Sequence, residues 1–402
     1  MSTRRKAIFI FLLPVSGALY AYTNLGALNL GDPVYAPAAK ASALGLTSYS
    51  SAKNASCVFF NAAAMASFKD TRIFMNLPMM SVSERVIPDS DWSADTGGAY
   101  YNEHFYLDVP DFAVAFPFSE NVKLGAGVVK RQSFSYSHEK NTYEDSSYIG
   151  KLEYTGKGAI TGYNFAVAMK LGNVWSAGYA YEILSGKPTF ESIRVRSSVN
   201  YEEKAELDFS GARNVFSLYE DKAMWNVSLT YMTSSAMDYD CKYTATVSTV
   251  SASLKYGGNL KFPRTLALGI NHIWAGAVSA SVYFDIVKTF WSDSSFTAAG
   301  GVVKLNYRNS VSYHLGIEND LTSRLQLRYG MAFIPSYERS SVERALITAG
   351  FGWYLSANMY FNFGYAYGRR NYIQNWEGGG ISYSGRLDES MNIFNFSVDW
   401  KI

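Results

Sequence analysis

The chain has 402 residues, a formal net charge of only +2 and 17% charged residues. Its lysines and arginines are scattered, which excludes the basic stripe expected of a nucleic-acid-binding protein. Its 31 Tyr, 25 Phe and 8 Trp exceed what a water-soluble protein ordinarily needs on alternating positions. Such aromatic residues are typical of the girdles of a membrane β-barrel.

The first residues have the pattern of an export signal. Arg4, Arg5 and Lys6 precede a largely apolar run over 7–19, and Tyr20-Ala21 follows as a cleavage point. We therefore predict a signal peptide over 1–21. Beyond it we find no uninterrupted apolar run of about 18 residues, the length that a spanning helix needs. The sequence predicts an exported chain without a helical membrane span.

Residues 22–69 are rich in alanine and lack the alternation of a strand. They indicate short helical turns and loops, which lie either in the periplasm or inside a barrel. No Gly/Ser linker or charged run separates them, so we predict an N-terminal hatch, a plug inside the lumen. Its candidate gate is Phe59, Phe60, Asn61, Ala62 and Ala63, because two aromatic side chains before a polar turn could close the lumen. Alternatively, these residues only pack the plug against the wall.

From about residue 70 onward, apolar residues alternate with polar ones, as on strands with one apolar face. We expect an all-β chain, a 14-stranded antiparallel transmembrane β-barrel over 70–402, because single-chain bacterial barrels have an even number of strands. The predicted strands are 73–77, 112–118, 122–128, 163–171, 175–181, 225–231, a weak segment 243–254, 266–270, 278–286, 311–317, 325–333, 347–355, 361–367 and 394–402.

The last strand shows the two faces of the predicted wall. Phe394, Phe396, Val398, Trp400 and Ile402 fall on one side, as on the closing strand of an outer-membrane barrel. The apolar strips of the other strands likewise carry no charge, because Arg or Lys facing lipid at mid-membrane costs about 2–4 kcal/mol. The opposite faces predict a lumen that is at least partly polar; they include Lys123, Arg131, Asp285, Arg308, Arg324 and Arg328.

The connections between the predicted strands alternate in length. Short turns lie at 119–121, 172–173, 275–276, 319–320 and 356–358, rich in residues that tolerate hairpin geometry. Longer polar stretches cover 83–110, 138–157, 185–222 and 369–387. Short periplasmic turns and long, surface-exposed loops are typical of outer-membrane barrels, whereas a soluble all-β protein gives no reason for the alternation.

Several segments resemble the FadL-type outer-membrane transporters of long-chain fatty acids and other hydrophobic molecules. The segment ASALGLTSYSSAKNASCVFFNAAAMASF is similar to the family's hatch, although the family usually has Asn-Pro-Ala after the aromatic pair. DFAVAFPFSENVKLGAGVV, LKFPRTLALGINHIWAGAVSASVYFDIVKTFW and VSYHLGIENDLTSRLQLRYGMAFIP also match in character. The resemblance implies a monomeric barrel with a plug, surrounded by outer-membrane lipids, that passes apolar ligands without energy. The assembly machinery of the outer membrane would recognise its C-terminal strand.

A fatty acid needs an apolar groove and a cation for its carboxylate. We predict Arg131, Arg324 and Arg328 as the lumenal cations; alternatively, they line a solvated lumen or pair with Asp285 and Glu318. Gly125 and Gly127 lie on the third strand, where the family's wall has a kink that opens sideways to lipid. Strand glycines do mark bends, yet here they could simply make room for the plug.

Catalysis, metals and cofactors have little support in the sequence. The four histidines (His104, His138, His272 and His314) have no other candidate ligand or catalytic residue at a spacing typical of a metal or catalytic site. Ser312, His314 and Asp285 form the one Ser/His/Asp grouping that the strand pattern allows. Cys57 and Cys241 either pair in the oxidising periplasm or remain free thiols. We therefore expect a transporter with no enzymatic activity and no cofactor.

Three functions compete for such a barrel. The first is passive uptake of long-chain fatty acids or other hydrophobic nutrients across the outer membrane. The second is a surface adhesin or structural barrel that binds host molecules through its long loops. The third is a general porin, which the predicted plug argues against because an aqueous pore needs an unobstructed lumen.

Overall fold

A computed structural model describes residues 31–34, 38–51, 53–88, 99–144, 147–196, 199–276, 279–298, 301–339, 341–378 and 381–402. The predicted signal peptide over 1–21 lies outside these residues. Within the described ranges, no helix has the length and apolar character needed to cross a membrane.

Fourteen strands form a closed ring, as predicted, and every neighbouring pair is antiparallel. The ring closes where the last strand pairs with the first, Trp400 opposite Ile73. In order, its members are β2 (Arg72–Pro88), β4 (Asp111–Pro117), β5 (Val122–Ser133), β8 (Ala159–Leu171), β9 (Trp175–Gly186), β11 (Val199–Asp221), β12 (Trp225–Met232), β15 (Thr265–Trp274), β16 (Ala280–Thr289), β19 (Ser310–Asp320), β20 (Leu325–Pro335), β21 (Glu343–Tyr354), β22 (Met359–Gly378) and β23 (Ile381–Lys401).

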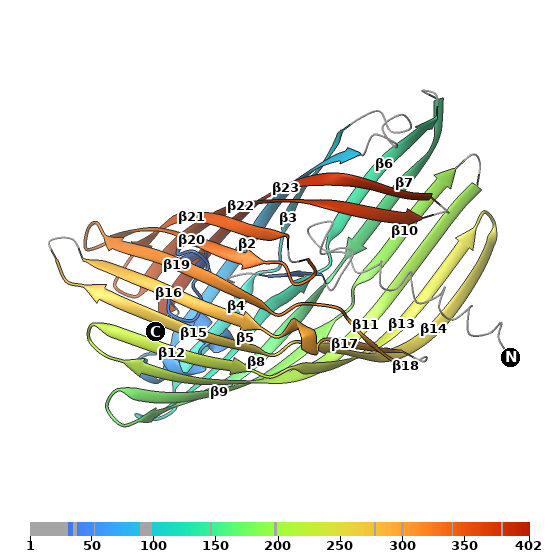
Figure 1. Ribbon diagram of the computed structural model, residues 1–402. Coiled ribbons are helices and arrows are strands. Elements are labelled where there is room, and N and C mark those ends of the chain that lie inside the picture. Colours follow the sequence, from blue (N-terminus) through green and yellow to red (C-terminus); the bar gives the residue numbers. More distant parts are fainter. Residues whose placement is uncertain are drawn as a thin grey trace.

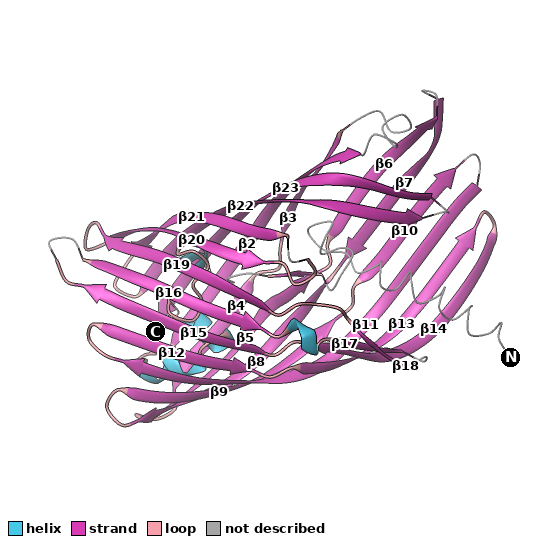
Figure 2. Cartoon of the chain, viewed as in Figure 1, coloured by secondary structure: helices cyan, strands magenta, loops and turns pink. Residues whose placement is uncertain are grey.

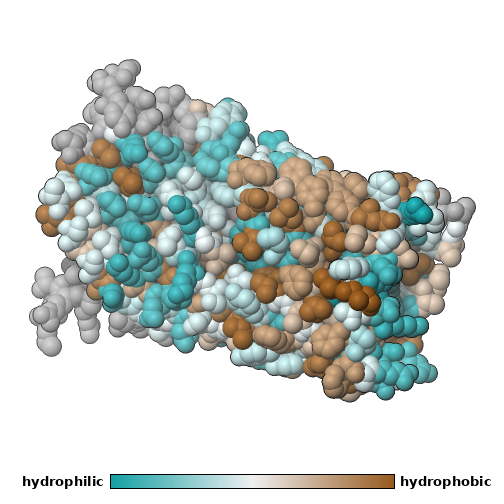
Figure 3. Space-filling view, turned by 180° about the vertical axis from the view of Figure 1, so that it is seen from behind, coloured by the Kyte–Doolittle hydropathy of each residue, from teal (hydrophilic) through white to brown (hydrophobic). Residues whose placement is uncertain are grey.

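Side chains alternate across this wall. On β23, Asn395 and Ser397 are buried in the lumen, whereas Trp400 on the other face is 45% exposed. The space-filling view shows hydrophobic residues gathered over one half of the barrel and hydrophilic ones over the other (Figure 3). This apolar zone is the surface that a barrel presents to lipid.

The other half of the barrel is extended by additional strands. They are β3 (Tyr100–Leu107), β6 (Tyr136–Glu144), β7 (Ser147–Lys157), β10 (Thr189–Arg196), β13 (Ser235–Val247), β14 (Val250–Phe262), β17 (Ser295–Ala298) and β18 (Gly301–Lys304). Most of the predicted long loops are therefore long β-hairpins. Figure 1 shows β6, β7, β10, β13 and β14 at the end opposite the C-terminus, which lies among the short turns.

One of the fourteen predicted strands was assigned wrongly and one wall strand was missed, so the count was still right. The stretch 185–222 was expected to be a loop, yet the Val215–Asp221 part of β11 is a wall strand between β9 and β12. Inward-facing Val215 and Tyr219 are buried as well as apolar, so β11 has apolar residues on both faces and loses its alternation. The weak segment 243–254 instead forms the tip of the β13–β14 hairpin, which turns at Ser248 with a φ of 55°.

Residues 38–68, named the hatch segment here, pack inside the ring. They contain α3 (Ala39–Ala43) and two 3-10 helices, η1 (Ala55–Phe59) and η2 (Ala62–Ser67). Helix α3 contacts β20 to β23, whereas η2 contacts β5, β8, β9 and β11 on the opposite side. The segment therefore crosses the barrel, and Figure 2 shows its short helices near the end that carries the short turns. Almost all of its side chains are buried because small residues, mostly alanine, let it approach the wall.

Candidate ligand site

A cavity of about 230 Å³ lies above the hatch segment, toward the extended end of the barrel. Its lining is largely apolar and includes Leu46, Phe60, Ile160, Leu184, Met232, Phe262, Val287, Trp291 and Ile334. Trp291, from the 3-10 helix η3 (Trp291–Asp293), stacks on Tyr337 with ring centroids 3.8 Å apart. An apolar cavity with a few convergent polar groups is typical of a site for a hydrophobic small molecule.

Two arginines at this cavity share one buried carboxylate. The Nε of Arg131 donates to Oε1 of Glu182 at 2.5 Å, and the Nε of Arg213 donates to Oε2. Glu182 is completely buried, whereas both guanidinium groups line the cavity. Two cations around one carboxylate leave one surplus positive charge beside an apolar space. This arrangement can bind one anionic group.

Arg131 lines this cavity, where its role as a ligand-binding cation stays a prediction, and it also contacts the hatch segment. Its Nη2 donates to the carbonyl oxygen of Phe59 at 3.0 Å, and its guanidinium lies 5.0 Å from the ring centre of Phe60. Arg213 is not among the predicted cations, because it lies on β11, in the stretch 185–222 that was expected to be a loop. A correct assignment of that strand would have placed its side chain on the lumenal face.

The other two predicted cations lie elsewhere. Arg328 is fully buried and donates to Glu318 at 2.6 Å and to Asn362 at 2.7 Å, which matches the alternative that it pairs with Glu318. Arg324 was expected to face the lumen beside Arg328, and this was wrong. It lies exposed in the turn before β20, since the strand begins only at Leu325.

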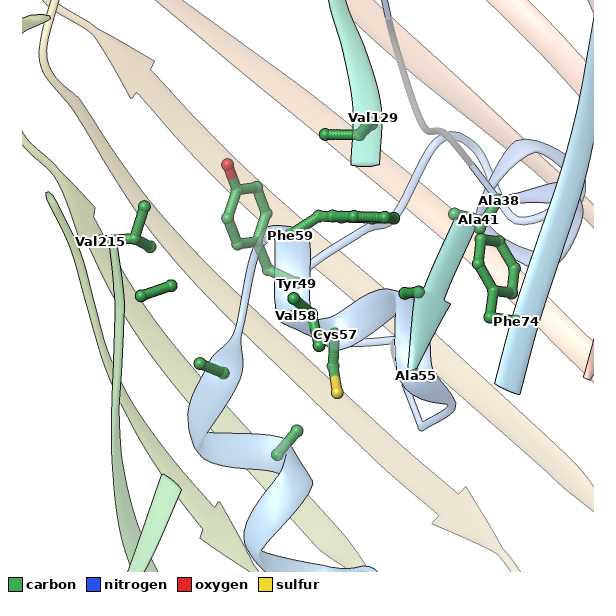
Figure 4. Close-up of a cluster of buried hydrophobic side chains, with 14 of the residues drawn as sticks. Ala38, Ala41, Tyr49, Ala55, Cys57, Val58, Phe59, Phe74, Val129 and Val215 are labelled. Atoms are coloured by element: carbon green, nitrogen blue, oxygen red, sulfur yellow. The ribbon is translucent and has the colours of Figure 1, made fainter. Parts of the chain in front are cut away.

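The predicted gate residues mostly fix the hatch segment in place. Phe59 is fully buried, and its ring meets that of Phe74 on β2 edge to face at 6.5 Å. Figure 4 shows Phe59 in a cluster that also contains Val129 and Val215 of the wall. Asn61, Ala62 and Ala63 are buried as well, and the Ala63 amide donates to Ser217 Oγ on β11 at 2.9 Å. Phe60 differs from these, because it is only partly buried and lines the cavity.

Gly125 and Gly127 make room for the hatch segment. A Cβ atom on Gly125 would lie 2.6 Å from Val58, and one on Gly127 would lie 2.7 Å from Phe59. Both glycines lie where β5 is paired on each side, with β4 and with β8. The irregularity in β5 comes further along, where a bulge separates Lys130 from Gln132. There β1 (Asp32–Pro33), rather than β4, pairs with the strand.

The Ser/His/Asp grouping is not a catalytic triad. Ser312 Oγ does lie 2.9 Å from His314 Nε2, but His314 Nδ1 donates to the carbonyl oxygen of Gly45 at 2.9 Å. Asp285 instead accepts hydrogen bonds from the amides of Tyr49 and Ser50. Ser312 therefore contacts His314, whereas His314 and Asp285 each contact the hatch segment. Asp285 does not accept a hydrogen bond from the imidazole of His314, as a triad would require.

Cysteines and metal ligands contribute nothing more to the site. Cys57 and Cys241 are both free and buried, which excludes the pairing that the sequence left open. Burial raises the pKa of the Cys57 thiol to about 12, so this thiol stays protonated. Across the described part of the chain, no three His, Cys, Asp or Glu side chains are grouped closely enough to hold a metal ion.

A closed ring of fourteen strands with an apolar outer zone, a charged lumen and an internal hatch segment is the architecture of an outer-membrane transport barrel. The chain belongs to the family of outer membrane transport proteins described as OMPP1/FadL/TodX, which matches residues 36–399. The protein therefore lies in the outer membrane, and its family forms channels for hydrophobic compounds. Among curated proteins, no match is found.

Solved structures show the same fold at low sequence identity. A Pseudomonas aeruginosa FadL homologue matches with a TM-score of 0.71 and 12% identity, over 92% of this chain and 99% of that one. The toluene transporter TodX of P. putida matches with a TM-score of 0.65 and 13% identity, over 91% and 98%. The Ralstonia pickettii toluene transporter TbuX gives 0.60 and 13%, over 91% and 98%.

Proposed function

We propose that this protein passively takes up long-chain fatty acids or similar hydrophobic nutrients that carry one anionic headgroup. The observation that supports it is the Arg131–Glu182–Arg213 group at the cavity. Its single surplus positive charge suits one carboxylate, and the apolar walls suit a hydrocarbon chain. A neutral hydrocarbon makes no use of these arginines, whose N–H groups at the cavity would lose water without gaining a partner.

The closed ring and the hatch segment also bear on the alternatives. The hatch segment crosses the lumen, which argues against a general porin with an open aqueous pore. The ring closes within one chain, which supports a monomer in contact with outer-membrane lipids. The aromatic outer face of β23 supports the proposal that the assembly machinery recognises this closing strand.

The triple variant Arg131→Gln/Glu182→Gln/Arg213→Gln tests the headgroup site without leaving an unpaired buried charge. We expect its affinity for a long-chain fatty acid to fall about tenfold or more, because hydrogen bonds to charged groups contribute about 1.5–3 kcal/mol. Its affinity for the primary alcohol of the same chain length should stay within about twofold. Binding to the purified protein in detergent measures both.

The matched control is Arg344→Gln/Glu389→Gln/Arg370→Gln. These three residues form a similar buried group, with Arg370 2.8 Å from Glu389, and they are not among the residues that line the cavity. The control changes the charge by the same amount and should bind the acid as the wild type does. Equal losses for acid and alcohol, or no loss in the first variant, would refute the proposal.

A further inference from the structure

Two cations flank an aromatic ring on the outer face of the barrel, where β15 and β16 end away from the short turns. The Cζ atom of Arg264 lies 4.5 Å, and the Nζ atom of Lys288 lies 5.0 Å, from the centre of the Phe290 ring. The Phe290 amide donates to the carbonyl oxygen of Arg264 at 3.0 Å. Figure 2 shows η3, which directly follows Phe290, as a short helix beside β17. Contact with a ring face orients a cation, so these two charges are positioned together.

Both cations lie at the outer limit of the apolar zone. Lys288 is opposite Leu266 and Val311 on the neighbouring strands, and Leu266 is 39% exposed on the lipid-facing side. Trp274 is 60% exposed at the other end of β15, beside a short turn. Arg264 precedes it by ten residues, which corresponds to about 25 Å of height on a strand tilted by about 40°. The apolar band of a membrane barrel is also about 25 Å tall, so both cations are level with the headgroups of the outer leaflet.

The charges at this height do not cancel. Asp293 pairs with Arg264, with Oδ2 and Nε 2.9 Å apart. Lys288 is exposed and forms no ion pair within the part of the chain that the structure describes. Arg308, also exposed, lies nearby because the residue after it accepts a hydrogen bond from Ser292 in η3 at 2.9 Å. Three cations, named the rim cations here, therefore surround one carboxylate, and their mutual repulsion favours a bound anion.

We propose that the rim cations bind a phosphate group of the phosphorylated glycolipid that forms the outer leaflet of the outer membrane. Arginine and lysine bind phosphate through charge-assisted hydrogen bonds. The height of the rim cations selects a lipid, because its phosphate then meets the cations while its acyl chains lie along Leu266 and the apolar wall below. Phospholipids of the inner leaflet have their headgroups at the opposite limit of the apolar zone. This inference concerns the outer surface and does not depend on the proposed uptake of an amphiphile.

Titration of the delipidated protein with bisphosphorylated lipid A, followed by native mass spectrometry in detergent, tests the site. We expect Arg264→Gln/Lys288→Gln to lower the affinity about tenfold or more, because hydrogen bonds between charged groups are lost. Lipid A without its phosphates should bind the wild type and this variant equally weakly. Lys288→Arg keeps the charge and should bind lipid A as the wild type does. The midpoint of unfolding in guanidinium chloride should stay unchanged in both variants, since the substituted side chains are exposed.

The matched control is Lys242→Gln/Lys255→Gln, which removes two neighbouring cations from the β13–β14 hairpin. These lysines are directly opposite each other and exposed, on strands that lie outside the wall. The control loses the same charge and should bind lipid A with the wild-type affinity. An equal loss in the control would mean that lipid A responds only to overall charge, and the proposed site would fail.

Two further probes distinguish the source of the phosphate. Inorganic phosphate at millimolar concentration should not displace lipid A, because it makes no contact with the apolar wall; displacement would indicate a site for soluble anions instead. Phosphatidylglycerol, with one negative charge and no phosphorylated sugar, should bind about tenfold more weakly or less than lipid A. Equal affinity for the two lipids, or no binding of lipid A to the wild type, would overturn the proposal. Fatty-acid binding at Arg131 and Arg213 is measured separately, so the two proposals fail independently.

Discussion

At the scale of single residues, the lumen is built from carboxylates that each hold two cations. Glu182 holds Arg131 and Arg213, Glu318 holds Lys40 and Arg328, and Glu389 holds Arg344 and Arg370. In each group, the carboxylate is the residue whose loss leaves two buried cations facing each other. Stability should therefore be more sensitive to the carboxylates than to the individual cations.

Glu182→Gln tests this dependence. We expect the substitution to destabilise the folded barrel by about 3–5 kcal/mol, as measured when one partner of a buried ion pair is removed. The midpoint of unfolding in guanidinium chloride, followed by tryptophan fluorescence in detergent, gives the change. Asp208→Asn is the control, because the Lys187–Asp208 pair is exposed and should contribute no measurable stability. Similar shifts for both variants would contradict the expectation.

Among the strands, β11 has two parts: one is a strand of the wall, and the other belongs to the additional strands that extend one half of the barrel. Its residues from Val215 onward pair with β12, whereas Tyr201–Gly211 pair with β13. The lipid-facing part therefore contains Phe216 and Leu218, and the tip of the β13–β14 hairpin lies beyond the wall. A charge should be tolerated differently on the two elements although both carry exposed apolar residues.

Phe216→Lys and Val250→Lys compare these environments. Phe216 is 48% exposed on the wall, and Val250 is 73% exposed at the hairpin tip. We expect Phe216→Lys to cost up to about 2–4 kcal/mol, the cost of a lysine facing lipid at mid-membrane. Val250→Lys should change the free energy of unfolding far less, because its side chain stays in water. Refolding equilibria into lipid vesicles measure both, and a larger cost at Val250 would contradict the placement of β11 in the wall.

At the scale of the whole molecule, the wall and the hatch segment are joined by side chains rather than by shared strands. All fourteen pairings of the ring are formed between wall strands. The hatch segment is held by contacts such as Gly45 N to Thr348 Oγ1 at 2.8 Å and Asn395 Nδ2 to Ser42 Oγ at 2.7 Å. The ring can therefore close without it.

Deletion of residues 22–66 should leave a folded but open barrel. We expect hydrophobic probes, and small sugars as well, to pass through liposomes carrying this variant faster than through wild-type liposomes. A barrel lacking 243–254, the tip of the β13–β14 hairpin, is the control and should stay closed. Unchanged passage after the first deletion would argue against a gating role for the hatch segment, including Phe60.

The class of fold and the membrane that contains it could be predicted from the amino-acid sequence alone. Lipid disfavours charged side chains at the outward positions of the wall strands. The apolar residues of each strand therefore recur at every second position of the sequence. The last strand, Phe394 to Ile402, shows this most clearly. The difference between short turns and long connections likewise needs no tertiary contact, because turn residues are recognised by their own backbone preferences.

The contents of the lumen, by contrast, could be known only from the folded barrel. An inward-facing residue can be polar where it meets water or an ion partner, and apolar where it meets the hatch segment. The alternation of polar and apolar residues is therefore lost beside the hatch segment, which is why β11 was missed. The same reason separates Arg131 and Arg213, which line the cavity, from Arg328, which is fully buried away from it beside Glu318, and from Arg324, which lies in a turn. Which inward cation remains available to a ligand depends on partners that are distant in sequence, and those partners are brought together only when the ring closes around the hatch segment.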